Sequence, residues 1–358
     1  MSIKTPIVKS VAFLLLAALL YGCSAEQQEP EPRREVKVTV LVGNRDDSSY
    51  NEGIVRWVRQ AEERYLGATD VDLIMDIAGL VVGSGNEHPE VERVLRGDSE
   101  LMLIVDQIAI PVLEPAAAYF PDKNFILIDM EATGRNVYSA LFKPNEAAFL
   151  CGALAAKMSE TGVIGIVIGM DVLGLQDFSV GFILGALEAD PDCKVIVSVA
   201  GSFSDTEKGY SAAADQFERG ADVCFGAAGG ASIGCIRAAS DYGRYAIGVD
   251  IDQTEIVAPE LRASILTSCM KFFDVLVTDT LDSYLDGTLI FGVSGRFGIK
   301  EGAVGIARNE YYMNTVPKDI QDEIDALEEQ IRTGAIRVRS AYEMTYAEID
   351  ALYKSVRP

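Results

Sequence analysis

Carboxylate and amine side chains that can bind a polar ligand follow several short apolar runs of the sequence. Asp106, Asp129 and Asp250 each come directly after such a run, and Lys271 lies just beyond another. A carboxylate accepts hydrogen bonds from neighbouring hydroxyls, and a nearby ammonium favours the ionised form of that carboxylate. We expect these carboxylates and this amine to converge on the ligand-facing edge of the sheets.

Aromatic and amide groups occupy similar places. Asp46, Tyr50 and Asn51 follow the first apolar run, and Phe225 precedes a glycine-rich turn that contains Gly229. An aromatic ring stacks on the face of a planar ligand, and an amide hydrogen-bonds its polar edge. We therefore expect these residues, which come from separate segments, to meet at one ligand site.

Each of these residues also has a purely structural explanation. Asn51 can cap a helix, and Tyr50 can pack on the helix that follows. Asp129 and Asp250 can cap turns, and Lys271 can simply be solvated. Their shared place after apolar runs favours binding, because ligands of open parallel sheets lie beyond the carboxyl ends of the strands.

The sequence lacks the motifs of the common catalytic and metal-binding classes. Its one histidine, His88, precedes Pro89 in a polar segment, and no Ser–His–Asp set, phosphate-binding lysine loop or HExxH motif is present. Five cysteines follow Cys23 without a CxxC pair, which leaves their pairing open and predicts no metal site. We predict that the protein is not an enzyme and binds no cofactor. The alternative that its acidic residues suggest is a calcium-dependent nucleoside hydrolase. The net charge of −23 excludes nucleic acid as a partner.

The N-terminus has the pattern of a secretory signal. Lys4 and Lys9 precede and flank an apolar run over 11–20, and Leu20-Tyr21-Gly22-Cys23 resembles a bacterial lipobox. We expect residues 1–22 to be a signal peptide, Cys23 to be acylated (palmitate among the chains), and 23–35 to be a flexible tether. An uncleaved apolar anchor is the alternative.

From Val36 onward, runs typical of strands alternate with segments of helical periodicity. Repeated β–α–β units predict an α/β fold with doubly wound parallel sheets. The pattern breaks near Leu141–Asn145, which predicts two lobes with a hinge and a cleft. The expected bounds are 36–143 plus about 252–285 for lobe 1, 144–251 plus about 286–342 for lobe 2, and 343–358 for a C-terminal extension.

The expected elements follow from these runs and periodicities. Ser204 and Glu207 suggest a capping box for one helix. The expected strands are 36–42, 71–77, 101–105, 125–128, 163–168, 195–199, 222–225, 246–249 and 265–269. The expected helices are 54–65, 110–119, 145–158, 178–187, 205–219, 233–242, 272–285 and 320–331.

Ordered blocks from about Val36 to Tyr342 resemble the basic membrane protein family of lipoproteins. The characterised purine-nucleoside receptors of this family have a type I periplasmic-binding fold, which is therefore the fold that the resemblance implies. The matching blocks are Asp46–Asn51, Phe120–Asp129, Asn145–Gly152, Ile168–Met170, Ser202–Asp205 with Lys208-Gly209, Ala227–Gly230, Ile247–Asp250, and Leu266–Ser268 with Lys271.

The resemblance also implies a role for each site residue. Tyr50 and Phe225 would sandwich a base, and Asn51 and Asp129 would hydrogen-bond its edge. The Asp matching Asp250 takes the ribose hydroxyls in these receptors, and the Lys matching Lys271 stands beside it.

Two departures from the family pattern lie on the ligand-facing edge of the first lobe. The segment before Asp46 is shorter and lacks the family's Thr-Asp, so that Asn44 or Asp46 stands in for it. Asp106-Gln107 replaces a glycine-containing turn and adds a carboxylate. Both changes bear on the identity of the base more than on the fold.

The function that the resemblance implies is capture of a small neutral ligand, with a purine nucleoside favoured, for an ABC-type permease and its ATPase. The protein would be a monomer, lipid-anchored in a membrane and facing the periplasm or the cell exterior. The alternatives are a surface lipoprotein that binds a host or cell-wall macromolecule and a sensor that reports another small molecule to a membrane partner.

Overall fold

The computed structural model describes most of the chain from Arg34 to Pro358, with gaps. The described residues are 34–42, 54, 56–57, 60, 63–65, 71–79, 95–105 and 117–358. The predicted site residues Asp46, Tyr50, Asn51 and Asp106 lie outside them, as do Cys23 and most of the predicted helix 110–119.

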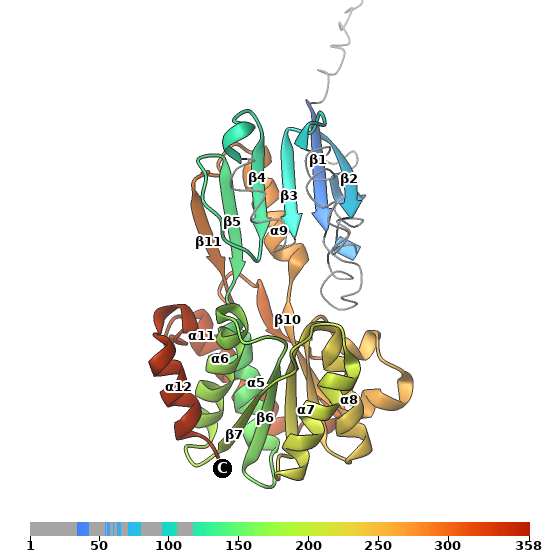
Figure 1. The fold of residues 1–358 in the computed structure, drawn as a ribbon, viewed down its shortest axis with the longest axis vertical. Helices are drawn as coiled ribbons and strands as arrows, with labels where there is room; N and C mark the ends of the chain where they lie inside the picture. The colour runs from blue at the N-terminus through green and yellow to red at the C-terminus, as the bar shows by residue number, and fades with distance from the viewer. Residues whose placement is uncertain are drawn as a thin grey trace, which may run out of the picture. The chain divides into compact units, whose positions relative to one another are not determined.

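Among the described residues, a first sheet, sheet A, has the strand order β2-β1-β3-β4-β5-β11 (Figure 1). The strand pairs β1/β3, β3/β4, β4/β5 and β5/β11 are parallel. All residues of β3 and β5 are buried, as expected for parallel strands covered on both faces. The strands are β1 (Arg34–Val42), β2 (Val71–Gly79), β3 (Leu101–Val105), β4 (Asn124–Ile128), β5 (Val137–Phe142) and β11 (Val293–Phe297).

A second sheet, sheet B, has the order β12-β10-β9-β8-β6-β7 in the described part of the chain. Four of its pairs are parallel, and β12 joins β10 in the antiparallel sense. The strands are β6 (Val163–Ile168), β7 (Lys194–Val199), β8 (Val223–Ala227), β9 (Tyr245–Asp250), β10 (Ile265–Lys271) and β12 (Val304–Ile306).

The two sheets are wound alike, although the sequence shows no internal repeat. In each sheet the first strand, β1 or β6, lies between the second and the third. At such a point the connections leave the first strand in opposite directions, and a crevice opens beyond the carboxyl ends of the flanking strands. The fold therefore marks the ends of β6 and β8 as ligand-facing.

Helices connect the strands of sheet B and continue beyond it (Figure 1). Among the described residues, none of these helices combines the length and the apolar character needed to cross a membrane. The helices are α5 (Pro144–Met158), α6 (Leu173–Ala189), α7 (Thr206–Glu218), α8 (Ser232–Asp241), α9 (Phe273–Leu285), α10 (Glu310–Thr315), α11 (Lys318–Arg332) and α12 (Tyr346–Ser355), with short 3-10 turns at Gly229–Ala231, Gln253–Glu255, Pro259–Ser264 and Ala341–Glu343.

Glycines let α5 and α6 pack with their backbones in contact. A Cβ added at Gly152 would lie 1.9 Å from the carbonyl oxygen of Phe182, and one at Gly185 would lie 1.9 Å from that of Phe149. Gly181 fits against the Asn145 backbone in the same way. No side chain fits between the two helices at these positions. The two helices therefore pack at a short distance, and this contact helps to position the first turn of α6.

The strand pairing corrects the predicted division into lobes at two places. Strand β10, expected in lobe 1, pairs with β9 and β12 in sheet B. Strand β11, expected in lobe 2, pairs with β5 in sheet A. An apolar run indicates a strand but not its partner, because the partner depends on where the preceding crossover returns the chain.

Two helix starts also differ from expectation. The residue that caps α7 is Asp205, whose side chain accepts hydrogen bonds from the amides of Glu207 and Lys208, so the predicted Ser204–Glu207 capping box is wrong. A carboxylate is a stronger acceptor than a hydroxyl at this position. Helix α6 begins at Leu173, before the predicted Phe178.

The only tryptophan of the sequence, Trp57, is buried beside sheet A. Its indole Nε1 donates a hydrogen bond to Thr278 Oγ1 of α9 at 3.3 Å. The hydroxyl of Tyr65 donates a hydrogen bond to Asp282 of α9 at 2.5 Å. Trp57 and Tyr65 are therefore both hydrogen-bonded to α9. The segment around Trp57 is therefore attached to the helix that follows β10.

Candidate functional site

Lys271, the last residue of β10, lies between two of the predicted carboxylates. Its Nζ donates to Asp129 Oδ2 at 2.6 Å and lies 3.6 Å from Asp250 Oδ1. The side chains of Lys271 and Asp250 are each 8% exposed, and that of Asp129 is 20% exposed. Three residues at the ends of different strands therefore form one largely buried ion-pair network. The sequence predicts that they converge, and their binding of a ligand stays a prediction.

The electrostatic balance keeps Lys271 charged. Burial lowers the pKa of Lys271, but Asp129 and Asp250 oppose this effect and together raise the pKa above its ordinary value. The rings of Phe142 and Phe178 lie 5.6 and 5.3 Å from the ammonium, within range of a cation–π attraction. The ammonium is thus a permanent cation that holds two carboxylates in place.

Both carboxylates are on strained backbone. Asp129 has φ of 60° and Asp250 has φ of 65°, the only non-glycine residues with positive φ in the described part of the chain. This left-handed region is unfavourable for a residue with a Cβ, and strain of this kind clusters at ligand sites. The Asp129 amide is held by a 2.8 Å hydrogen bond to the Ala140 carbonyl. The backbone therefore turns sharply at Asp129 and at Asp250.

A cavity of about 260 Å³ opens beside this network. Asp129, Lys271 and Phe178 line one part of it, and Arg296 and Tyr342 line another. Its wall combines apolar, cationic and anionic groups, as small-molecule sites commonly do. The remaining lining residues are Met130, Glu131, Leu141, Phe142, Pro144, Val172, Gly174 and Leu175.

Phe225 does not line the cavity. It is fully buried, with its ring centroid 5.5 Å from that of Phe182 and 6.2 Å from that of Phe178. The predicted stacking role is therefore wrong for the described structure, because a ring in the core of β8 supports Phe178 rather than offering its own face. The predicted Gly229 is buried at the start of a 3-10 turn with φ of 54°.

Sequence reasoning missed Phe203 as a candidate ring. Phe203 is 40% exposed, and a Cβ added at Gly169 would lie 2.6 Å from its ring, so the ring rests on the backbone just beyond β6. Met170 and Val172, which follow Gly169, are also exposed. Both Gly169 and Phe203 lie in blocks that carry the family resemblance, which was the signal available in the sequence.

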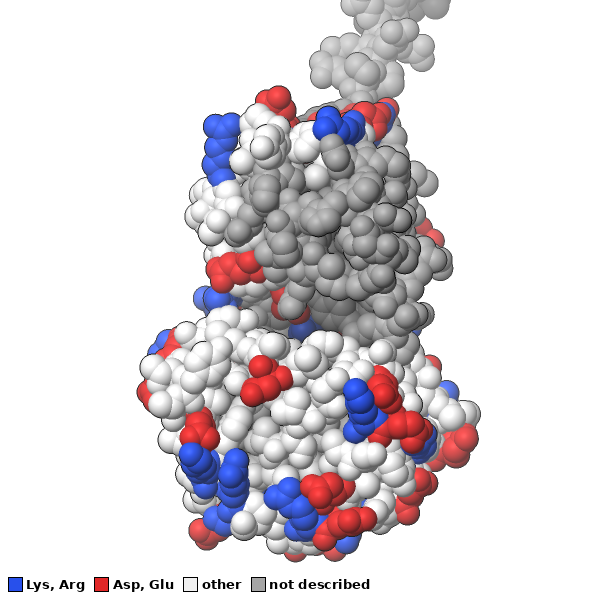
Figure 2. All heavy atoms as spheres, in the orientation of Figure 1, with Lys and Arg blue, Asp and Glu red and all other residues white. Residues whose placement is uncertain are grey.

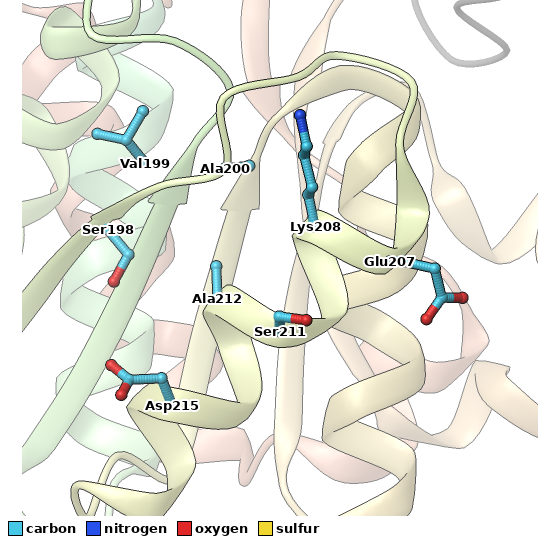
Figure 3. Close-up of a pocket in the computed structure, with 8 residues that line it drawn as sticks. All are labelled: Ser198, Val199, Ala200, Glu207, Lys208, Ser211, Ala212 and Asp215. Carbon is cyan, nitrogen blue, oxygen red and sulfur yellow. The ribbon is translucent and has the colours of Figure 1, made fainter.

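A larger hollow, of about 540 Å³, shares no lining residue with the Lys271 cavity. It lies between edge strand β7 and helix α7, and Figure 3 shows Lys208, Glu207 and Asp215 projecting from the helix around it. It is a wide surface groove with charges of both signs and contains none of the predicted site residues. We do not assign the ligand to it.

The charges on the described surface are mixed. Figure 2 shows lysine and arginine side chains beside aspartate and glutamate over the body formed by sheet B. Ion pairs such as Arg237–Glu207 at 2.9 Å and Lys157–Glu323 at 2.6 Å account for part of this pattern. On the face shown, the described residues therefore form no extended cationic surface.

Comparison with known proteins places this chain in a family. Residues 35–340 match the family model described as ABC transporter substrate-binding protein PnrA-like. The chain is similar to basic membrane protein A of Borreliella afzelii, at 30% identity over 82% of this chain and 89% of that protein. It is also similar to an uncharacterised lipoprotein of Pyrococcus abyssi, at 31% identity over 84% and 76% of the two chains.

A further relative has a stated ligand class. The ABC transporter nucleoside-binding protein BmpA of Lactococcus lactis is 31% identical over 63% of this chain and 67% of its own. Among solved structures, an ABC transporter solute-binding protein from Aeropyrum pernix matches with a TM-score of 0.73, at 22% identity over 90% and 97% of the chains. These findings confirm the type I periplasmic-binding fold, and the chain belongs to the PnrA-like family of ABC transporter substrate-binding proteins, the basic membrane proteins.

Proposed function

We propose that this protein captures a purine nucleoside and delivers it to an ABC-type permease. The observation that supports this ligand most directly is the network of Asp129, Lys271 and Asp250. One buried ammonium contacts both carboxylates, and carboxylate oxygens accept hydrogen bonds from the hydroxyls of a ribose or the N–H groups of a base. The nucleoside-binding relative supports the same ligand class.

The surroundings favour a neutral nucleoside over a nucleotide. The cavity-lining ring of Phe178 offers an apolar surface to a base. A phosphate would meet Asp129, Asp250 and Glu131 near the same cations, and this repulsion opposes an added negative charge.

Replacing Asp250 with Ala is expected to weaken nucleoside binding about a hundredfold, because charge-assisted hydrogen bonds to the ribose contribute roughly 1.5–3 kcal/mol each. Binding of the free base should change by less than about threefold. Isothermal titration calorimetry with inosine and hypoxanthine measures both. Asp215→Ala, which removes an exposed carboxylate of the α7 groove, is the matched control. Equal losses for nucleoside and free base would contradict this assignment of Asp250.

We further propose that Cys23 anchors the protein to a membrane through lipid. Cleavage before Cys23 and acylation of its thiol should give a mature chain that begins at this residue. Intact-mass spectrometry of detergent-extracted protein measures the N-terminus and the acyl mass together, and Cys23→Ala should yield a chain without that mass. A wild-type chain that retains residues 1–22 would count against the proposal.

A further inference from the structure

One wall of the Lys271 cavity comes from the end of the chain. Tyr342 lines the cavity, although the family match ends at residue 340. A Cβ added at Gly174 would lie 3.4 Å from the Tyr342 hydroxyl, so the phenol reaches the first turn of α6. A residue near the C-terminal end of the chain therefore contributes to the cavity wall.

Asp177 of α6 fixes the backbone that carries this tyrosine. Its Oδ1 accepts hydrogen bonds from Ser340 Oγ at 2.7 Å and from the Ala341 amide at 2.6 Å. Ser340 Oγ in turn accepts from the Tyr342 amide at 3.2 Å. The Asp177 side chain is almost fully buried, and this burial raises its pKa to about 6. A buried carboxylate with two short hydrogen bonds holds the segment firmly.

The rest of the C-terminal segment is attached to the same body. Tyr353 of α12 hydrogen-bonds Ser179 of α6. The Val356 carbonyl accepts from the Val195 amide at 2.8 Å, at the start of β7. Ile349 is buried against Val180 in a small apolar cluster. Tyr342 is thus supported on both sides along the chain.

Tyr342 in turn positions a cation from the other sheet. The guanidinium of Arg296, in β11 of sheet A, lies 4.8 Å from the Tyr342 ring centroid. The carboxylate of Glu131 lies 3.8 Å from the guanidinium, which is beyond hydrogen-bond distance. A guanidinium that stacks on a ring through its face can still donate hydrogen bonds from the N–H groups at its edge. Arg296 therefore presents donors to the cavity, whereas Asp129 and Glu131 present acceptors.

We propose that Arg296 and Tyr342 form a wall that selects 6-oxopurine nucleosides over 6-aminopurine nucleosides, with Asp177 as its positioning residue. This inference rests on the proposed nucleoside function. The O6 and N7 atoms of inosine or guanosine accept from a guanidinium, and their N1–H donates to a carboxylate. Adenosine keeps the N7 acceptor, but it reverses the polarity at the other two positions, because its N6 donates and its N1 accepts. A site built for one pattern leaves polar groups unpaired with the other.

The test compares the dissociation constants of inosine and adenosine by calorimetry. The wild-type protein should bind inosine about tenfold to a hundredfold more tightly, corresponding to one charge-assisted hydrogen bond. Arg296→Gln should weaken inosine by that factor, leave adenosine within about threefold, and so remove the preference. Tyr342→Ala and Asp177→Ala should shift the ratio in the same direction. Tyr346→Ala, on the same segment with a 72% exposed side chain outside the cavity, should leave the ratio unchanged.

Thermal unfolding of each variant shows whether a changed ratio of affinities comes from the loss of the Arg296–Tyr342 wall or from unfolding of the protein. If Asp177→Ala does not fold, Tyr342→Ala carries the test, because its side chain is 47% exposed. Equal wild-type affinities for the two nucleosides, or an unchanged ratio in Arg296→Gln, would overturn the wall while leaving the nucleoside function intact. A wild-type protein that binds neither nucleoside would overturn both proposals.

Discussion

Replacing Lys271 with Met should lower the free energy of unfolding by about 3–5 kcal/mol, because it leaves buried carboxylates without their cation. Met fills a similar volume, so the loss reports charge rather than packing. The side chains of Lys271 and Asp250 are each 8% exposed, and the new apolar group cannot compensate either Asp250 or Asp129. The same variant should lose ligand binding, because the ammonium would no longer hold the two carboxylates in place.

Urea unfolding at neutral pH, followed by far-UV circular dichroism, measures this effect. The matched control is Lys318→Met, which removes a 72% exposed lysine paired with Asp322 at 2.6 Å on the surface of α11. An exposed pair of this kind contributes at most about 1 kcal/mol. Similar losses in the two variants would mean that the Lys271 network is solvated and contributes little to the fold.

Replacing Gly152 with Ala should destabilise the protein by about 3 kcal/mol or more, although Ala is the better helix former. The new methyl would lie 1.9 Å from the Phe182 carbonyl oxygen and 2.7 Å from its carbonyl carbon. These are backbone atoms of α6, so no side chain can turn away and the whole helix must shift. Gly185→Ala should have a comparable effect, because its methyl meets the Phe149 backbone from the opposite helix.

Gly174→Ala is the matched control on α6. A Cβ at this position meets only the Tyr342 hydroxyl, at an ordinary contact distance of 3.4 Å. Helix propensity alone should then stabilise the protein by up to about 1 kcal/mol. Thermal and urea unfolding of the three variants provide the comparison. A Gly152→Ala protein as stable as Gly174→Ala would show that the two helices separate readily.

Much of the fold is predictable because short parallel strands are buried on both faces. Runs such as Leu101–Val105 and Val163–Ile168 are apolar throughout, and the structure begins and ends the strands at these residues. The places of Asp129 and Asp250 follow from the same rule, since Asp129 comes directly after a buried strand and Asp250 is the last residue of another. The place of Lys271 beside Asp250 comes from the family resemblance, because the sequence predicts β10 in the other lobe.

The remaining details depend on contacts that no local pattern encodes. Phe225 and Phe203 both follow or end apolar segments, yet the packing of Phe178 and Phe182 buries only the first. The partners of β10 and β11 depend on which sheet each crossover reaches. Tyr342 lies far along the chain from every strand end, and long-range contacts such as the Asp177 hydrogen bonds bring it to the cavity.

The hydrogen bond from Trp57 to Thr278 makes the lone indole a spectroscopic reporter of one part of the molecule. Its emission responds to the packing of α9 beside sheet A, whereas Lys271, Gly152 and Gly185 belong to sheet B or the helices that cover it. Fluorescence and circular dichroism should give coincident melting curves only if both sheets unfold as one cooperative unit. A fluorescence midpoint that stays fixed while the dichroism midpoint falls in Gly152→Ala would identify two separately melting bodies joined by the chain.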